Sequence, residues 1–127
     1  MPMAQRFASL EEWLAGLREE DAPIVVEGPK DFSALEGFGI RNVVTLSREP
    51  LYKVVEGIAA SSKRVIILTD LDKEGKRLYS KLKQGFDRAG VQVDTVYREW
   101  LFRETELSHI EGLAAYVEHK EQKEGRP

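Results

Sequence analysis

The sequence predicts an α/β protein: a doubly wound, parallel sheet of about four strands flanked by helices. Three observations support this fold class. Short runs of β-branched and aliphatic residues alternate with longer amphipathic segments along the chain. The runs at Ile24–Val26 and Val65–Leu68 are apolar at every position, as expected for strands that are covered on both faces. Proline and glycine stand at the boundaries between the segments, where helices begin and end.

The first expected element is a helix that begins after Ser9 and runs to about Glu20. Ser9 and Glu12 have the spacing of a capping box, in which each side chain accepts a hydrogen bond from the other residue's backbone N–H. Four apolar residues then repeat at helical spacing: Leu10, Trp13, Leu14 and Leu17. This amphipathic helix precedes the alternating part of the chain.

The alternating part begins at residue 24. Its expected strands are Ile24–Glu27, Asn42–Leu46, Arg64–Asp70 and Val91–Tyr97. The helices between them are expected to begin at Pro29, at Pro50 and at about Lys73, because proline suits the first turn of a helix and aspartate precedes many first turns. Their expected ends lie at Gly37 and Gly39, near Ala60, and at Ala89 before Gly90. In the third of these helices Leu78, Leu82 and Phe86 lie at helical spacing.

The carboxy-terminal part is expected to form one more helix, over Thr105–Glu121. Its inner side is expected to hold five apolar residues: Leu107, Ile110, Leu113, Ala114 and Val117. The charged residues from Glu121 to Pro127 are expected to fray.

Length and composition limit the classes of protein to consider. At 127 residues, the chain is expected to form one domain over 1–127, with its core at about 23–97. It has no cysteine, which excludes disulfides and thiolate metal sites. It has no apolar run long enough to cross a bilayer, and Met1–Arg6 lacks the apolar stretch of a secretory signal. We therefore expect a cytoplasmic protein that does not bind a membrane. Nothing in the sequence indicates an oligomeric state.

The charge and the histidine content narrow the possible ligands. The formal net charge of −3 argues against bulk electrostatic attraction to nucleic acid, so such contact needs a local basic patch. With only His109 and His119 in the chain, a histidine-rich metal site is not expected. Any metal is expected to have oxygen ligands.

Three acidic residues stand at the ends of expected strands. Glu27 ends the first strand, and Asp70 and Asp72 follow the third. If the strand order is the flavodoxin-like 2-1-3-4, these strands are neighbours roughly 5 Å apart, and their carboxyl ends share one rim of the sheet. Clustered carboxylates repel one another, and a bound Mg²⁺ reverses that penalty. The pattern therefore predicts a site for Mg²⁺, with Mn²⁺ as the alternative cation.

Each of these acids also has a structural alternative. Asp72 is well placed as the N-cap of the following helix, a role that can coexist with metal binding. Glu27 can form a salt bridge with Lys30. Asp70 is harder to explain by structure alone, because burying a carboxylate at a strand end is costly unless it is paired.

The residues around the acids indicate how a phosphate could reach the site. Gly28 and Gly75 leave room for backbone or phosphate to approach. Four basic residues lie nearby and are candidate phosphate contacts, although a solvated helix face also explains each of them: Lys30, Lys73, Lys76 and Arg77.

These motifs resemble the Toprim domain, which is shared by topoisomerases, bacterial-type primases, nucleases that mature 5S ribosomal RNA, and recombination-repair proteins. The family pattern is a strand ending in Glu-Gly, then a later strand ending in Asp-x-Asp with a glycine shortly after. Here these elements are Glu27-Gly28 and Asp70-Leu71-Asp72 with Gly75. The resemblance covers roughly Pro23 to Tyr97 and implies the Rossmann-like Toprim fold.

The resemblance also implies roles for single residues. Glu27 matches the family's glutamate, a general acid or base in nucleotidyl transfer or strand cleavage that also lies at the metal. Asp70 and Asp72 match its Mg²⁺ ligands. Asp31 matches an acid often found after Glu-Gly, although an acid in the first turn of a helix is equally explained by the helix dipole. The zinc module of primases and the ATPase and gate of topoisomerases are absent, so the chain resembles a small stand-alone Toprim protein, closest to the 5S ribosomal RNA maturation nucleases without their extra carboxy-terminal part.

Three functions follow as hypotheses. The first is Mg²⁺-dependent phosphodiester cleavage or nucleotidyl transfer on structured RNA, including ribosomal RNA, or on DNA. The second is a non-catalytic nucleic-acid or ribosome-associated binding module, for which Arg98–Arg103 supplies aromatics between arginines; packing by Trp100 and Phe102 is the alternative explanation. The third is a phosphatase of the haloacid dehalogenase type. Its Asp-x-Asp motif is expected on the first core strand before Thr or Val, whereas here it follows the third strand and precedes Lys73.

Overall fold

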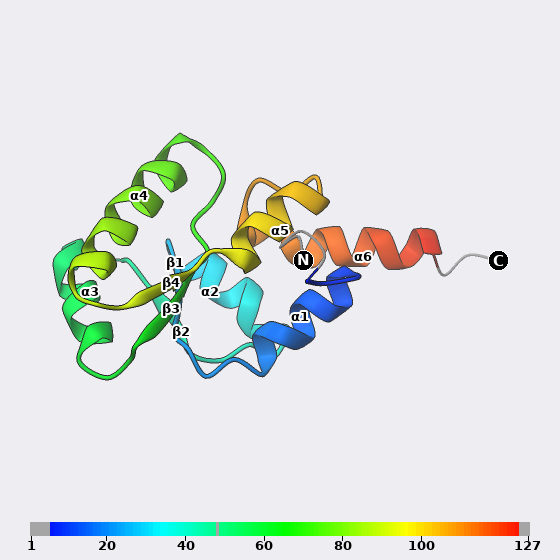
Figure 1. Ribbon diagram of the computed structural model, residues 1–127. Helices are drawn as coiled ribbons and strands as arrows, with labels where there is room; N and C mark the ends of the chain where they lie inside the picture. The colour runs from blue at the N-terminus through cyan, green and yellow to red at the C-terminus, as the bar shows by residue number, and fades with distance from the viewer. Residues whose placement is uncertain (1–5, 48, 125–127) are drawn as a thin grey trace.

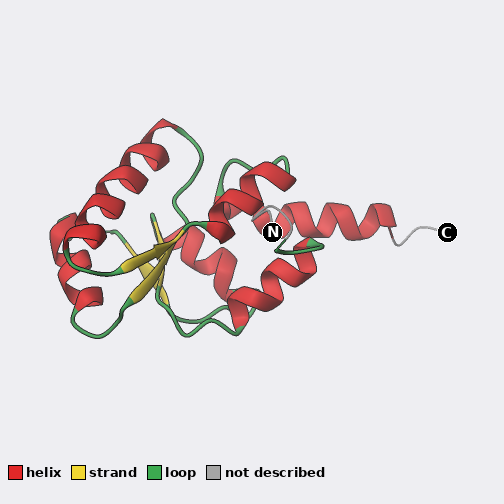
Figure 2. Ribbon diagram, viewed as in Figure 1, coloured by secondary structure: helices red, strands yellow, loops and turns green. Residues whose placement is uncertain are grey.

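The computed structural model describes residues 6–47 and 49–124, and its centre is a four-stranded, all-parallel sheet in the order β2-β1-β3-β4 (Figures 1 and 2). The strands are β1 (Ile24–Val26), β2 (Val43–Thr45), β3 (Arg64–Ile67) and β4 (Gln92–Asp94). The helices are α1 (Leu10–Arg18), α2 (Pro29–Glu36), α3 (Leu51–Ala59), α4 (Lys73–Arg88), α5 (Val96–Glu104) and α6 (Leu113–Glu124), with a 3₁₀ helix, η2, at Ile110–Gly112. The expected α/β fold and the assumed strand order are confirmed.

Helices cover both faces of the sheet, and alternate residues of the strands point to each side. On one face Val25, Val65 and Ile67 pack against α3 and α4. On the other face Ile24, Val26, Ile66 and Leu68 pack against α1, α2 and α5. Figure 1 shows α3 and α4 together on one side of the sheet and α1, α2 and α5 on the other. This two-sided burial explains why the central strands are apolar at every position.

The helices begin where the sequence indicated. The Ser9 hydroxyl accepts a hydrogen bond from the Glu12 N–H at 3.2 Å, and the Glu12 carboxylate accepts one from Ala8 rather than from Ser9. Pro29 occupies the first turn of α2, and Pro50 is the N-cap of α3. The apolar residues expected on the inner face of α1 are all buried: Leu10, Trp13, Leu14 and Leu17.

The expected fourth strand, Val91–Tyr97, is wrong at its end. β4 stops at Asp94, whose carboxylate accepts a hydrogen bond from the Val96 N–H at 2.9 Å and turns the chain into α5. The sequence analysis missed this helix, although four of its residues have helical spacing and are buried: Val96, Tyr97, Trp100 and Leu101. Trp100 donates its indole N–H to the Phe7 carbonyl oxygen at 3.1 Å, so its packing role is confirmed.

The third strand is also shorter than expected, because β3 ends at Ile67 rather than at Asp70. Its neighbour β1 ends at Val26, and the last hydrogen bond between the two segments runs from the Leu68 N–H to the Val25 carbonyl. Beyond that point no strand is left to pair with, and the chain leaves the sheet toward α4.

The carboxy-terminal helix begins later than expected and runs further. Thr105–His109 is irregular, and α6 extends to Glu124, so the expected fraying from Glu121 is wrong as far as Glu124. On the expected inner side, Ile110 and Leu113 are buried, Leu107 and Val117 are half-buried, and Ala114 is exposed. The expectations for Met1–Gln5 and for Gly125–Pro127 lie outside the described residues. Within the described part of the chain, no helix has the length and apolarity needed to span a membrane.

Candidate metal centre

The carboxyl ends of β1 and β3 lie side by side and bring two of the predicted acids together. Glu27 follows β1, Asp70 lies three residues after β3, and the Asp70 N–H donates a hydrogen bond to the Glu27 Oε2 at 2.7 Å. The expectation that these acids share one rim of the sheet is confirmed. Because the neighbouring strands run in parallel, the start of α2 and the start of α4 also meet at this rim.

Asp70 is a buried carboxylate that is held by a distant part of the chain. It is 9% exposed, and its Oδ1 accepts a hydrogen bond from the Ile110 N–H at 2.8 Å. Burial raises the pKa of Asp70, and the hydrogen bond from Ile110 offsets part of that rise. The sequence indicated that a carboxylate at this position needs a partner, and the structure supplies one from η2.

Asp72 is the N-cap of α4, as its alternative explanation predicted. Its Oδ1 accepts a hydrogen bond from the Gly75 N–H at 2.7 Å, which lowers the pKa of Asp72. Its other oxygen, Oδ2, lies 3.1 Å from the Nε2 atom of His109. Capping therefore uses one oxygen and leaves the second at the rim, so helix capping and metal binding are compatible.

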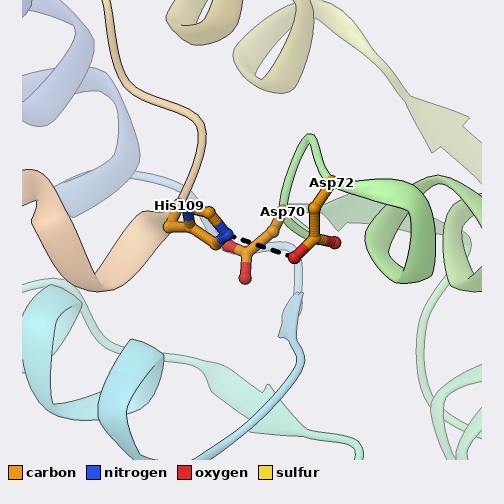
Figure 3. A group of neighbouring side chains, drawn as sticks. All are labelled: Asp70, Asp72 and His109. Carbon is orange, nitrogen blue, oxygen red and sulfur yellow. Dashed lines mark hydrogen bonds and ion pairs between the residues drawn. The ribbon is translucent and has the colours of Figure 1, made fainter.

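Asp70, Asp72 and His109 form a compact group that could hold a metal ion (Figure 3). One ligand atom from each residue lies within 4.8 Å of the others. Two carboxylates and one imidazole are a donor set that divalent cations accept, so the residues fit a divalent metal. Among residues 6–47 and 49–124, the group consists of these three residues and does not include Glu27. Glu27 lies next to the group, because its carboxylate accepts a hydrogen bond from the Asp70 N–H.

His109 is the member of this metal group that the sequence analysis did not find. The expectation of oxygen ligands rested on the small number of histidines, and the structure adds a nitrogen donor. His109 is 37 residues beyond Asp72 and lies in an irregular segment. No local motif marks it, because its position depends on how that segment docks on the rim.

Glu27 and Asp31 complete the acidic surroundings of the group. Burial raises the pKa of Glu27, and the negative charges of Asp70, Asp72 and Asp31 raise it further, against the hydrogen bond from the Asp70 N–H. Asp31 is 6% exposed and accepts a hydrogen bond from the Gly28 N–H at 3.2 Å. Burial raises its pKa as well, with Asp70 as the second cause. The salt bridge to Lys30 that was the structural alternative for Glu27 is not formed between these two described residues.

The two glycines at the rim differ in what surrounds them. A Cβ atom on Gly75 would overlap the carbonyl group of Asp70, so the backbone approach expected there is confirmed. A Cβ atom on Gly28 would meet no protein atom within 4 Å, so only open space lies beside it. Gly75 is therefore required by the turn that carries Asp70 and Asp72.

Arg98 is a second residue that the sequence did not place at the rim, since the pattern put it only in the candidate nucleic-acid segment Arg98–Arg103. Its guanidinium donates hydrogen bonds to the carbonyl oxygens of Thr69 at 2.8 Å and Asp70 at 2.7 Å. It lies over the ring of Tyr79, 4.6 Å from the centroid, and 5.4 Å from that of Phe102. Arg98 thus satisfies carbonyl groups beyond the end of β3 and holds the rim in place, and its predicted part in a nucleic-acid surface stays a prediction.

The four basic residues predicted to contact phosphates are exposed on two helices. Lys30 lies in the first turn of α2, and Lys73, Lys76 and Arg77 lie at the start of α4. The Arg77 guanidinium pairs with the carboxylate of Glu74 at 2.7 Å. Lys30 also lines an open hollow of about 540 Å³ between α2 and the start of α6.

Comparisons with known proteins agree with the fold. The family model of the Toprim domain matches residues 22–101. A UPF0292 protein of Pyrococcus abyssi is 41% identical over 77% of this chain and 74% of its own length. A UPF0292 protein of Methanosarcina acetivorans is 33% identical over 95% of this chain and 88% of its own length. A solved structure of a protein from Aquifex aeolicus has a TM-score of 0.78 and 36% identity, covering 83% of this chain and 98% of that one.

Proposed function

The chain belongs to the Toprim domain family and is related to UPF0292 proteins, and on this premise we propose that it acts on nucleic acid with a divalent metal. The proposed reaction is phosphodiester cleavage or nucleotidyl transfer on structured RNA or DNA. The observation that carries the proposal is the meeting of Glu27, Asp70 and Asp72 at one rim, where the acids face one another without a lysine or arginine partner among the described residues.

The cation proposed for this rim is Mg²⁺, with Mn²⁺ as the alternative. Asp70 and Asp72 would hold it, together with His109. The bound ion would neutralise the acids and stabilise charge that develops on a phosphate. It would also let an acidic surface receive a polyanion, which the net charge of −3 otherwise opposes.

Glu27 is proposed to hold or move a proton. One of its oxygens, Oε2, accepts the Asp70 N–H, so proton transfer is assigned to the other oxygen, Oε1. In the metal-free protein, burial and the acidic neighbours raise the pKa of Glu27, so its carboxyl group holds a proton more readily than an exposed glutamate does.

The rim is also surrounded by groups that attract phosphate. The amino termini of α2 and α4 point their unpaired N–H groups toward this end of the sheet. Lys30 and Lys73 stand in the first turns of these two helices, and Lys76 and Arg77 continue along α4. We assign these four side chains to contacts with the phosphate backbone of the nucleic acid. Such contacts position the substrate without reading its sequence.

The test is cleavage of labelled, structured RNA and of duplex and single-stranded DNA, with and without Mg²⁺ or Mn²⁺. The wild-type protein is compared with Glu27→Gln, Asp70→Asn and Asp72→Asn, and the exposed Asp21→Asn serves as the matched control. Metal-dependent cleavage that the three rim variants lose and the control keeps supports the proposal. If nucleic acid binds but is not cut under any of these conditions, the chain is a binding module instead.

The substrate is identified by crosslinking in cells and sequencing of the bound RNA and DNA. Enrichment of ribosomal RNA precursors would assign the protein to RNA processing, and enrichment of DNA would assign it to repair or replication. Equal recovery from the wild type and from a variant in which Lys30, Lys73 and Lys76 are replaced by Gln would contradict the assigned contact surface.

A further inference from the structure

The segment after α5 docks on the metal group from outside the part of the chain that the Toprim domain matches. That match ends at residue 101, whereas the docking segment is Thr105–Gly112. The Leu71 N–H donates to the Ser108 carbonyl oxygen at 2.8 Å, and the Ile110 N–H donates to the Asp70 carboxylate at 2.8 Å. These two hydrogen bonds fix the backbone on either side of His109 to the turn that carries the two aspartates.

The imidazole ring of His109 is also oriented by its neighbours. Its Nδ1 atom lies 3.0 Å from the Ser108 hydroxyl, and its Nε2 atom faces Asp72 Oδ2 at 3.1 Å (Figure 3). Histidines that bind metals commonly have one ring nitrogen held by such a partner while the other faces the ion. Ligand atoms that are adjacent around an octahedral ion, at about 2.1 Å from it, are separated by about 3 Å. The separation between His109 and Asp72 matches that spacing.

We propose that His109 is a nitrogen ligand that makes this centre prefer a first-row transition metal, such as Mn²⁺ or Co²⁺, over Mg²⁺. The inference rests on the proposed metal function of the rim and narrows its cation, because of the two ions proposed above it favours Mn²⁺ over Mg²⁺. Mg²⁺ binds oxygen ligands and keeps much of its water, whereas imidazole favours the transition metals. The two aspartates attract either class of ion by their charge, and His109 makes the site bind transition metals more tightly than Mg²⁺.

The other explanation of His109 is a simple pair with Asp72 at the surface. The two side chains are 46% and 44% exposed, so solvent screens the pair and it contributes little to stability. A surface pair predicts no nitrogen signal from a bound ion and no change in metal preference when the histidine is replaced. The two explanations therefore predict different EPR signals and different metal affinities.

The experiment is calorimetric titration of the full chain with Mg²⁺ and with Co²⁺, and pulsed EPR of bound Mn²⁺. It uses the wild type, His109→Ala, Asp70→Asn, and His119→Gln as the matched control, because His119 is exposed on α6. We expect His109→Ala to weaken Co²⁺ binding on the order of 10-fold or more and Mg²⁺ binding by less than about 3-fold. The Mn²⁺ spectrum is expected to show coupling to a nitrogen nucleus in the wild type and in His119→Gln, and to lose it in His109→Ala.

The outcomes separate this inference from the proposed function. If Asp70→Asn abolishes binding of both ions while His109→Ala leaves their affinity ratio unchanged, or if wild-type Mn²⁺ shows no nitrogen coupling, the ligand role of His109 is wrong and the metal centre stands. If the wild type binds neither ion, both proposals are wrong. Circular dichroism and thermal unfolding of metal-free His109→Ala check that its fold is intact, which the exposure of the side chain leads us to expect.

Discussion

Two groups of acidic side chains in this molecule are neutralised in different ways. In the first, the paired cluster, Glu20 and Asp94 share the guanidinium of Arg64, at 2.7 and 3.2 Å. Arg6 lies 3.7 Å from Asp94, and the Tyr97 hydroxyl donates to Glu20 at 2.7 Å. Every carboxylate of the paired cluster therefore meets a cation supplied by the chain.

In the second, the rim cluster of Glu27, Asp31 and Asp70, the hydrogen-bond donors are backbone N–H groups. They come from Asp70, from Gly28 and from Ile110. Among the described residues no lysine or arginine forms a salt bridge with these carboxylates, and burial raises the pKa of each. The paired cluster satisfies itself, whereas the rim cluster keeps negative charge that a cation from solution would neutralise. The two clusters therefore differ in that the first contains its own cations, whereas the second is where we propose that a cation binds.

The largest effect is expected from Gly75→Ala, which breaks the turn beneath the rim. The added methyl group overlaps the Asp70 carbonyl, and backbone has to move to make room. We expect a loss of about 3 kcal/mol or more in the free energy of unfolding, measured with urea. The control is Gly57→Ala in α3, where a Cβ meets no atom within 4 Å and a gain of up to about 1 kcal/mol is expected. Equal effects of the two substitutions would contradict the close approach at Gly75.

The next largest effect is expected from Arg64→Ala, which removes the shared cation of the paired cluster. Glu20 and Asp94 are then left 12% and 10% exposed with weaker partners. The Arg64 side chain is itself 34% exposed, so solvent reduces the loss to about 2 kcal/mol. Binding of divalent metal should not change, because the paired cluster is not part of the metal group. The exposed Arg77→Ala, which breaks only the solvent-screened pair with Glu74, should leave the stability nearly unchanged.

Asp70→Asn tests whether the rim, unlike the paired cluster, keeps its stability when a charge is removed. The amide keeps an oxygen that can accept the Ile110 N–H and removes a charge that burial disfavours. The metal-free variant should therefore unfold within about 1 kcal/mol of the wild type. A loss of more than about 2 kcal/mol would show that the ionised Asp70 carboxylate stabilises the fold, as the acids of the paired cluster do.

A smaller effect is expected from pH. Because the pKa values of Glu27, Asp31 and Asp70 are raised above their usual 4.5 and 3.8, the folded protein binds protons that the unfolded chain releases at the same pH. This cluster therefore adds stability as the pH falls from 7 through the raised pKa values toward the usual ones. Between pH 7 and 5, metal-free wild type should gain more stability, or lose less, than Asp70→Asn in urea unfolding. Identical pH profiles would show that the charge of Asp70 does not matter to the fold.

Much of the fold was predictable from the sequence because local signals agreed with one another. The runs at Ile24 and Val65 are apolar on both faces, and proline marks the starts of α2 and α3. The missed helix, α5, shows where such signals conflict. Val96 and Tyr97 continue a run that favours a strand, and only their spacing to Trp100 and Leu101 reveals the helix.

The site was predictable as far as it depends on strand ends. Glu27, Asp70 and Asp72 follow directly from where β1 and β3 stop and α4 begins. His109 and Arg98 were not predicted to lie at the rim, because each reaches the rim through a tertiary contact. Arg98 donates hydrogen bonds to two carbonyl groups that are free because β3 ends early. The position of His109 depends on the docking of an irregular segment. Residues of this kind are found from the packing of the chain rather than from spacing along it.

Asp70 and Asp72 are proposed to hold a divalent cation at the rim together with His109, and calorimetric unfolding in the presence and absence of Mg²⁺ tests this claim most directly. At a Mg²⁺ concentration one hundred times the dissociation constant, binding to the folded state adds about 2.7 kcal/mol. We predict that wild type and Arg64→Ala both unfold at a higher temperature with Mg²⁺, and that Asp70→Asn does not. An unchanged unfolding temperature of the wild type, or an equal rise in Asp70→Asn, would contradict the claim.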